Sequence, residues 1–170
     1  MIVYTGEGKG KTTAALGLTL RSLGYGKKVL IIQFGKAVFS GEVKALKKFG
    51  SQVKLIQGGK GFVGILGDQK PLEEHKKAAE IAFSKLNKEI ISDKWDLVIA
   101  DEIIGAVYAK LLNERSVLDL ISHKPIFVDL VLTGWGASQK MISGADLVSE
   151  IKSIKHPFEH GLKAKKGIDF

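Results

Sequence analysis

Short apolar runs alternate with helix-like stretches along the whole chain. The predicted strands are residues 2–5, 29–34, 53–57, 96–101, 126–133 and 147–151. Residues 29–34 are apolar with one polar break, which is typical of a strand covered on both faces of a sheet. The predicted helices are residues 11–23, 42–49, 71 to about 92, 103–112, 117–122 and 137–142, with Pro71 in the first turn of the longest. This alternation predicts an α/β fold with a mostly parallel sheet of about six strands and helices on both faces.

A glycine-rich segment interrupts the alternation. Residues 58–67 hold five glycines in ten positions, so we expect them to form a loop. Ligands of parallel α/β sheets bind at the carboxyl ends of the strands, so we expect the functional residues there.

Length and composition limit the classes of protein to which the chain can belong. The chain has 170 residues, which predicts one domain spanning residues 1–170. It has no cysteine, which excludes disulfides, thiolate metal sites and cysteine nucleophiles. No apolar run approaches the roughly 20 residues of a membrane span, and the N-terminus lacks the basic start and apolar core of a signal peptide. We therefore expect a cytoplasmic protein without a membrane partner.

The charge balance favours a partner that carries phosphate. Lysine and arginine together number 26 against 18 acidic residues, giving a net charge of +8. A basic surface attracts either nucleic acid or the phosphate tail of a nucleotide. Only Arg21 and Arg115 are arginines, and the lysine runs are not interleaved with aromatic residues. Both features argue against nucleic acid, which is read by arginine and by stacking aromatics.

The strongest chemical signal is the segment that follows the first predicted strand. Gly10-Lys11-Thr12 completes the phosphate-binding pattern G-x-x-x-x-G-K-[ST], although Thr5 stands where the opening glycine belongs. A strand precedes the loop and a helix follows it, so backbone N–H groups converge on phosphate oxygens. Lys11 would reach the terminal phosphates and the Thr12 hydroxyl would bind Mg²⁺. The predicted ATP-binding residues are Gly6, Glu7, Gly8, Lys9, Gly10, Lys11, Thr12 and Thr13.

A second signal ends the fourth predicted strand. An apolar run closes with Asp101 and Glu102, the arrangement of a Walker B element that holds or orients Mg²⁺ beside the loop. Thr12, Asp101 and Glu102 are therefore the predicted metal residues. The two motifs together predict binding of a nucleoside triphosphate with Mg²⁺ and leave the reaction open.

Several stretches bear a more specific resemblance. The loop from Thr5 resembles the P-loop of ATP:corrinoid adenosyltransferases, in which a threonine also precedes the glycines. Further likenesses are Gln33-Phe34, Gly61-Phe62, Asp101-Glu102 and residues 132–134. The C-terminal residues 145–151, 155–158, 161–164 and 167–170 are similar to the ending of that family almost residue for residue. The resemblance covers the chain from its first strand to its last residue and is loosest at about residues 37–94.

The resemblance implies a RecA-like P-loop domain, often paired as a homodimer, that transfers the 5′-deoxyadenosyl group of ATP to a reduced cob(I) corrinoid and releases triphosphate. Cob(I) is itself a strong nucleophile, so the protein must only align the reactants and stabilise the charge that builds on the leaving group. Lys9, the loop amides and a Mg²⁺ or Mn²⁺ ion would do so, with Lys11 and Glu102 as the catalytic residues. A flavoprotein or another electron donor would supply cob(I).

Two positions depart from the pattern of the family. Trp135 stands where the family usually has an arginine that holds phosphates, and Gly64 stands where a second aromatic residue is expected. Phe62 remains the predicted corrinoid-binding ring.

Three alternatives stay open at this point. The chain could be a P-loop ATPase or small-metabolite kinase that kept the scaffold and changed the acceptor. It could be a nucleic-acid-binding module controlled by ATP, or a nucleotide-binding regulator without turnover.

Overall fold

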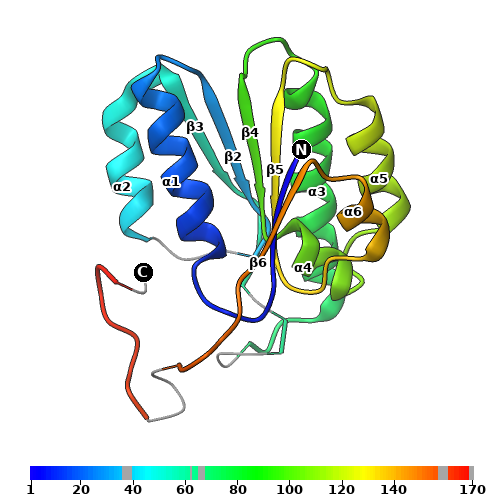
Figure 1. Ribbon diagram of the computed structural model, residues 1–170. Coiled ribbons are helices and arrows are strands. Elements are labelled where there is room, and N and C mark those ends of the chain that lie inside the picture. The colour runs from blue at the N-terminus through cyan, green and yellow to red at the C-terminus, as the bar shows by residue number, and fades with distance from the viewer. Residues whose placement is uncertain (36–39, 62, 65–67, 157–160, 169–170) are drawn as a thin grey trace.

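Six strands form one parallel sheet in the computed structural model, which describes residues 1–35, 40–61, 63–64, 68–156 and 161–168 (Figure 1). The strands are β1 (Ile2–Thr5), β2 (Val29–Gln33), β3 (Val53–Gln57), β4 (Leu97–Asp101), β5 (Asp129–Thr133) and β6 (Leu147–Glu150). Their order across the sheet is β3-β2-β4-β5-β1-β6, and every neighbouring pair is parallel. The α/β fold with a parallel sheet of about six strands and helices on both faces, predicted from the sequence, is confirmed.

Helices cover both faces of the sheet (Figure 1). One face carries α1 (Lys11–Gly24), α2 (Gly41–Leu46) and the short 3₁₀-helix η1 (Lys47–Gln52), and the other carries α3 (Leu72–Ile90), α4 (Ile103–Tyr108), α5 (Glu114–His123) and α6 (Gln139–Ser143). Alternate residues of a strand point to opposite faces, so Val29 and Ile31 pack with α1 while Leu30 and Ile32 pack with α3. All five residues of β2 are buried, as its apolar pattern predicts.

No helix among the described residues is both long enough and apolar enough to cross a lipid bilayer.

The register of the strands brings several polar residues to one edge of the sheet. Gln33 lies opposite Asp101, and Tyr4 lies opposite Thr133, so the carboxyl ends of β1, β2, β4 and β5 are level. This edge is the lower one in Figure 1. Because β5 lies between β1 and β4, the end of β5 separates the loop after β1 from the acids after β4.

Helix α4 is shorter than the predicted helix over residues 103–112. It ends at Tyr108 because Lys110 adopts a left-handed conformation, with φ 58°. The Leu111 N–H then donates to the carbonyl of Ala106 and the Lys110 N–H to that of Val107, which closes the last turn. No glycine or proline marks this end in the sequence, so the apolar pattern runs past it.

Two helices begin at side-chain caps that hydrophobic periodicity does not reveal. Asn113 accepts a hydrogen bond from the Arg115 N–H, so α5 starts before the predicted residue 117. Ser138 accepts one from the Met141 N–H, so α6 starts later than the predicted residue 137.

Three further boundaries differ from the prediction. Pro71 has an extended ψ of 141° and immediately precedes α3 rather than lying in its first turn. The predicted helix 42–49 divides into α2 and η1. Strand β5 begins at Asp129 instead of residue 126, because the Val128 N–H donates to the Pro125 carbonyl and leaves Ile126 98% exposed in a turn.

Candidate active site

The loop between β1 and α1 folds around the side chain of Lys11. The Lys11 ammonium donates hydrogen bonds to the carbonyl oxygens of Gly6, at 2.8 Å, and Gly8, at 2.9 Å. Gly10, with φ 117°, is the left-handed residue that turns the loop into α1. An ammonium group has three N–H donors, so one remains for a ligand while the lysine stays in this position.

The chain after β6 lies directly against this loop. The Gly8 N–H donates to the Ile151 carbonyl at 2.7 Å, and the Ile151 N–H donates to the Thr5 carbonyl at 2.8 Å. A Cβ on Gly6 would lie 2.4 Å from the Ile151 oxygen, and one on Gly8 would lie 2.7 Å from the Lys152 oxygen. These contacts require glycine at both positions, which explains part of the loop sequence without reference to phosphate.

Thr5 occupies the position of the first glycine in the phosphate-binding pattern, and its side chain forms a hydrogen bond there. Its hydroxyl accepts a hydrogen bond from the Ala137 N–H at 3.3 Å, and the residue is buried. The threonine therefore connects the start of the loop to the segment before α6.

Asp101 is the centre of a buried hydrogen-bond network. One carboxylate oxygen, Oδ1, accepts from the Thr12 hydroxyl at 2.9 Å and from the Thr133 hydroxyl at 2.7 Å. The other, Oδ2, accepts from the Gln33 amide at 3.1 Å, and the Gln33 oxygen in turn accepts from Gln57. Asp101 is 1% exposed. The network joins the first turn of α1 to β2, β4 and β5, and it brings together Thr12 and Asp101 as the sequence predicts.

Glu102 adopts a strained backbone conformation next to this network. Its φ of 64° and ψ of 18° are left-handed, which for a residue other than glycine costs on the order of 1–3 kcal/mol. The Glu102 N–H donates to the Thr133 hydroxyl at 2.9 Å, so one threonine fixes both acids of the predicted Walker B pair. The conformation ends β4 abruptly and starts α4 at the next residue.

The hydroxyl of Thr12 and the carboxylates of Asp101 and Glu102 are of the chemical type that binds a metal ion shared with a phosphate. Mg²⁺ prefers hard oxygen ligands and usually takes one or two carboxylates from the protein together with substrate phosphates and water. No group of three or more His, Cys, Asp or Glu side chains that could hold a metal by itself occurs among the described residues.

A groove of about 650 Å³ opens beside the loop. Its polar end is lined by Glu7, Lys11 and Glu102, and the rest of the lining is largely apolar. Phe34 after β2 and Leu111 after α4 belong to the apolar part, as do Tyr108, Trp135 and Val63. Phe62, the predicted corrinoid-binding ring, lies outside the described residues.

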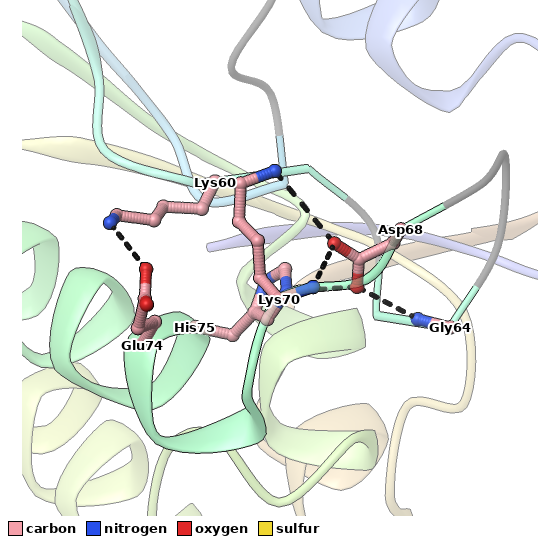
Figure 2. Close-up of polar contacts among 6 residues, drawn as sticks. All are labelled: Lys60, Gly64, Asp68, Lys70, Glu74 and His75. Atoms are coloured by element: carbon pink, nitrogen blue, oxygen red, sulfur yellow. Dashed lines mark hydrogen bonds and ion pairs between the residues drawn. The ribbon is translucent and has the colours of Figure 1, made fainter.

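Polar contacts tie the glycine-rich loop to the start of α3 (Figure 2). The Asp68 carboxylate accepts from the backbone N–H groups of Gly64, at 3.1 Å, and Lys70, at 3.3 Å, and lies 2.9 Å from the His75 ring. The hydrogen bond from Gly64, with the one from Lys70 and the charge of His75, holds the pKa of Asp68 below its usual value. A more exposed ion pair joins Lys60 to Glu74 at 2.8 Å. These contacts hold the loop that supplies Gly61 and Val63 to the groove.

The structure thus gathers the predicted loop, Asp101 and Glu102 at one edge of the sheet, with Glu7, Lys9 and Thr13 exposed at its surface. Sequence reasoning missed Thr133 and Gln33 as partners of Asp101. Each is the polar last residue of a strand in which at least three apolar residues precede it, and that signal could have found them. It also missed Tyr108, for which the sequence offers no signal.

Comparison with known proteins extends these observations. The chain matches, over residues 1–170, the model of the family described as ATP:corrinoid adenosyltransferase BtuR/CobO/CobP. It is 32% identical to the corrinoid adenosyltransferase of Escherichia coli K12 over 171 residues, which cover all of this chain and 85% of that protein. It is 35% identical to the corrinoid adenosyltransferase of Pseudomonas aeruginosa, over all of this chain and 83% of that protein. It is 34% identical to the corrinoid adenosyltransferase of Salmonella typhimurium, over all of this chain and 85% of that protein.

Among solved structures, the chain is similar to a KaiC-like protein of the archaeon Pyrococcus horikoshii. The TM-score is 0.49 with 13% identity, over 90% of this chain and 71% of the other. The full-length family match and the relatives above 30% identity agree with the resemblance carried by the loop and the C-terminal segment. The chain belongs to the ATP:corrinoid adenosyltransferases, a family of enzymes.

Proposed function

We propose that the protein transfers the 5′-deoxyadenosyl group of ATP to the cobalt of a reduced cob(I) corrinoid and releases triphosphate. The observation that carries the proposal is the position of the groove, whose polar end contains Lys11 and Glu102 and whose remainder is largely apolar. A triphosphate and the largely apolar face of a corrin ring can therefore meet in one site, in a chain that belongs to this enzyme family.

In this proposal the triphosphate occupies the loop of residues 6–13. Its oxygens replace the carbonyls of Gly6 and Gly8 as partners of the Lys11 ammonium. Backbone N–H groups at the start of α1 and the exposed Lys9 add positive potential. Stabilising the charge that grows on the leaving group is the main electrostatic task of the site.

The chemistry requires no side-chain base. The electron pair of cob(I) forms the bond between cobalt and C5′, and the electrons of the broken bond between C5′ and O5′ leave with the triphosphate. The protein contributes alignment of the two reactants and exclusion of water. The largely apolar lining around Phe34 and Leu111 is suited to the second of these tasks.

Thr12, Asp101 and Glu102 would hold Mg²⁺ or Mn²⁺, which would supply charge neutralisation on the phosphates. A hydroxyl has one donor and two lone pairs, so Thr12 can bind a cation while it continues to donate to Asp101. Asp101 then acts mainly by orienting Thr12.

We further propose a cytoplasmic homodimer in which residues 1–170 act as one domain. An external electron donor, for which a flavoprotein is the proposed class, supplies the cob(I) acceptor.

The test is ³¹P NMR of the protein with MgATP under anaerobic conditions, with and without chemically reduced cob(I)alamin. We expect triphosphate to appear only when the corrinoid is present. ADP and phosphate formed without regard to the corrinoid would instead identify an ATPase or kinase on the same scaffold. Unchanged ATP in both samples would refute adenosyl transfer to this acceptor.

A further inference from the structure

Two aromatic side chains from different elements form one side of the groove. Tyr108 is the last residue of α4, and Trp135 lies two residues beyond the end of β5. Their ring centroids are 4.2 Å apart with a tilt of 55°. Tyr108 is 54% exposed and Trp135 44% exposed, although both line the groove beside Lys11 and Glu102. The rings support each other and still leave a large aromatic surface open to a ligand.

The backbone around Trp135 is built for this contact. Gly134 and Gly136 have φ values of 139° and 80°, which are left-handed. A Cβ on Gly134 would lie 2.5 Å from the Gly105 nitrogen, and a Cβ on Gly136 would lie 2.4 Å from the Tyr108 ring. Only glycine lets the segment after β5 approach α4 this closely. The position of Trp135 is therefore set before any ligand arrives.

We propose that the Tyr108–Trp135 pair is the docking surface for the corrin macrocycle of the acceptor. The inference rests on the proposed function and assigns acceptor binding to two specific residues. Aromatic faces bind large, flat and mainly apolar partners with little loss of side-chain freedom.

The adenine of ATP is the competing occupant of these rings. Adenine recognition needs donors and acceptors placed at the edge of the base. In the described lining of the groove, the charged groups Glu7, Lys11 and Glu102 all belong to the phosphate end. Apart from the Tyr108 hydroxyl and the Trp135 ring N–H, the described remainder of the lining is apolar side chains and glycine. That lining fits the face of a macrocycle better than the edge of a nucleobase.

A second tryptophan, away from the groove, provides a control for substitutions of Trp135. The chain contains two tryptophans, and the other, Trp95, lies just before β4 at the opposite edge of the sheet. The Trp95 ring N–H donates to Glu89 at 2.8 Å. Trp95→Phe therefore removes one indole from the protein without touching the groove.

The experiment compares Trp135→Ala, Trp135→Leu and Trp135→Phe with Trp95→Phe and the unchanged protein. KM is measured separately for cob(I)alamin and for ATP. The Kd of cob(II)alamin, which lacks the nucleophilic electron pair, is measured by anaerobic calorimetry in the presence of ATP. We expect Trp135→Ala and Trp135→Leu to raise the corrinoid KM and Kd by at least about tenfold while the KM for ATP changes less than about twofold. Trp135→Phe retains most of the binding, and Trp95→Phe leaves both constants unchanged.

The outcomes separate this inference from the proposed function. A rise in the KM for ATP alone would overturn the inference in favour of adenine stacking. Unchanged constants in folded Trp135→Ala and Trp135→Leu, with triphosphate still released, would overturn it while adenosyl transfer stands. If the unchanged protein neither releases triphosphate nor binds cob(II)alamin, the proposed function and the inference fall together.

Discussion

Replacing Thr133 by valine should destabilise the protein more than any other loss of a single hydroxyl at the site. The hydroxyl donates to the Asp101 carboxylate at 2.7 Å and accepts from the Glu102 N–H at 2.9 Å. Thr133 is fully buried, so water cannot take over either role. Valine has nearly the same shape, and the change therefore isolates the two hydrogen bonds.

The expected loss follows from what each bond contributes. A hydrogen bond to a charged group contributes roughly 1.5–3 kcal/mol, and a buried donor left without an acceptor costs roughly 1–3 kcal/mol. Together they predict that Thr133→Val lowers the free energy of unfolding by about 3–5 kcal/mol. In a chain of this length each kcal/mol lowers Tm by about 2–4 °C, so Tm should fall by about 6–20 °C.

Urea unfolding followed by circular dichroism, at pH 7 without nucleotide, measures this difference. Two variants serve as controls. Thr133→Ser keeps the hydroxyl and loses only a methyl group, which costs about 1 kcal/mol. Thr19→Val removes another fully buried hydroxyl, but that one donates only to the Ala15 carbonyl within α1, and the loss should stay below about 1 kcal/mol. If Thr133→Val is as stable as Thr133→Ser, the network around Asp101 does not hold the site together and the reasoning is refuted.

Four other substitutions should also have measurable effects on activity or stability. Lys11→Ala should reduce triphosphate release at least about 100-fold while exposed Lys27→Ala does not, as measured by ³¹P NMR. The pKa of Asp68 is lowered in the folded protein, so its ionised carboxylate stabilises the fold above about pH 4, and this stabilisation is lost as the pH falls through the folded pKa. The difference in free energy of unfolding between the unchanged protein and Asp68→Asn should therefore be large at pH 7 and should disappear in acid, as measured by urea titrations. Gly17→Ala on the exposed side of α1 meets no atom within 4 Å and should stabilise by about 0.5–1 kcal/mol in urea unfolding. Gly136→Ala, whose Cβ would strike the Tyr108 ring at a positive φ, should destabilise by about 1–3 kcal/mol in the same assay.

The sequence predicts the sheet well because a strand that is buried on both faces consists almost entirely of apolar residues. The all-buried strands β2 and β4 read as continuous apolar runs, and their positions in the structure differ little from the prediction. The ends of helices are harder to predict, because a cap such as Asn113 acts through one hydrogen bond that hydrophobic periodicity does not register. The left-handed turn at Lys110 has no local sequence signal at all.

The candidate site also has one part that the sequence predicts and other parts that it does not. Its polar end could be predicted because phosphate binding imposes a contiguous pattern of glycine, lysine and threonine. The side-chain partners of Asp101 come from three elements far apart in sequence, α1, β2 and β5, and strand order alone brings Thr133 beside it. The Tyr108–Trp135 contact depends on two close approaches by glycine, which a single sequence does not distinguish from ordinary turns.

Strand β5 connects the two halves of the site. Its last residue, Thr133, fixes Asp101 and Glu102, and the next three residues turn the chain towards α4 and place Trp135 against Tyr108. Side chains alternate between the faces of a sheet, so a shift of β5 by one residue would move the Thr133 hydroxyl away from both acids. The same shift would withdraw Trp135 from the groove. The placement of Thr133 beside the two acids and that of Trp135 beside Tyr108 therefore both depend on the register of β5.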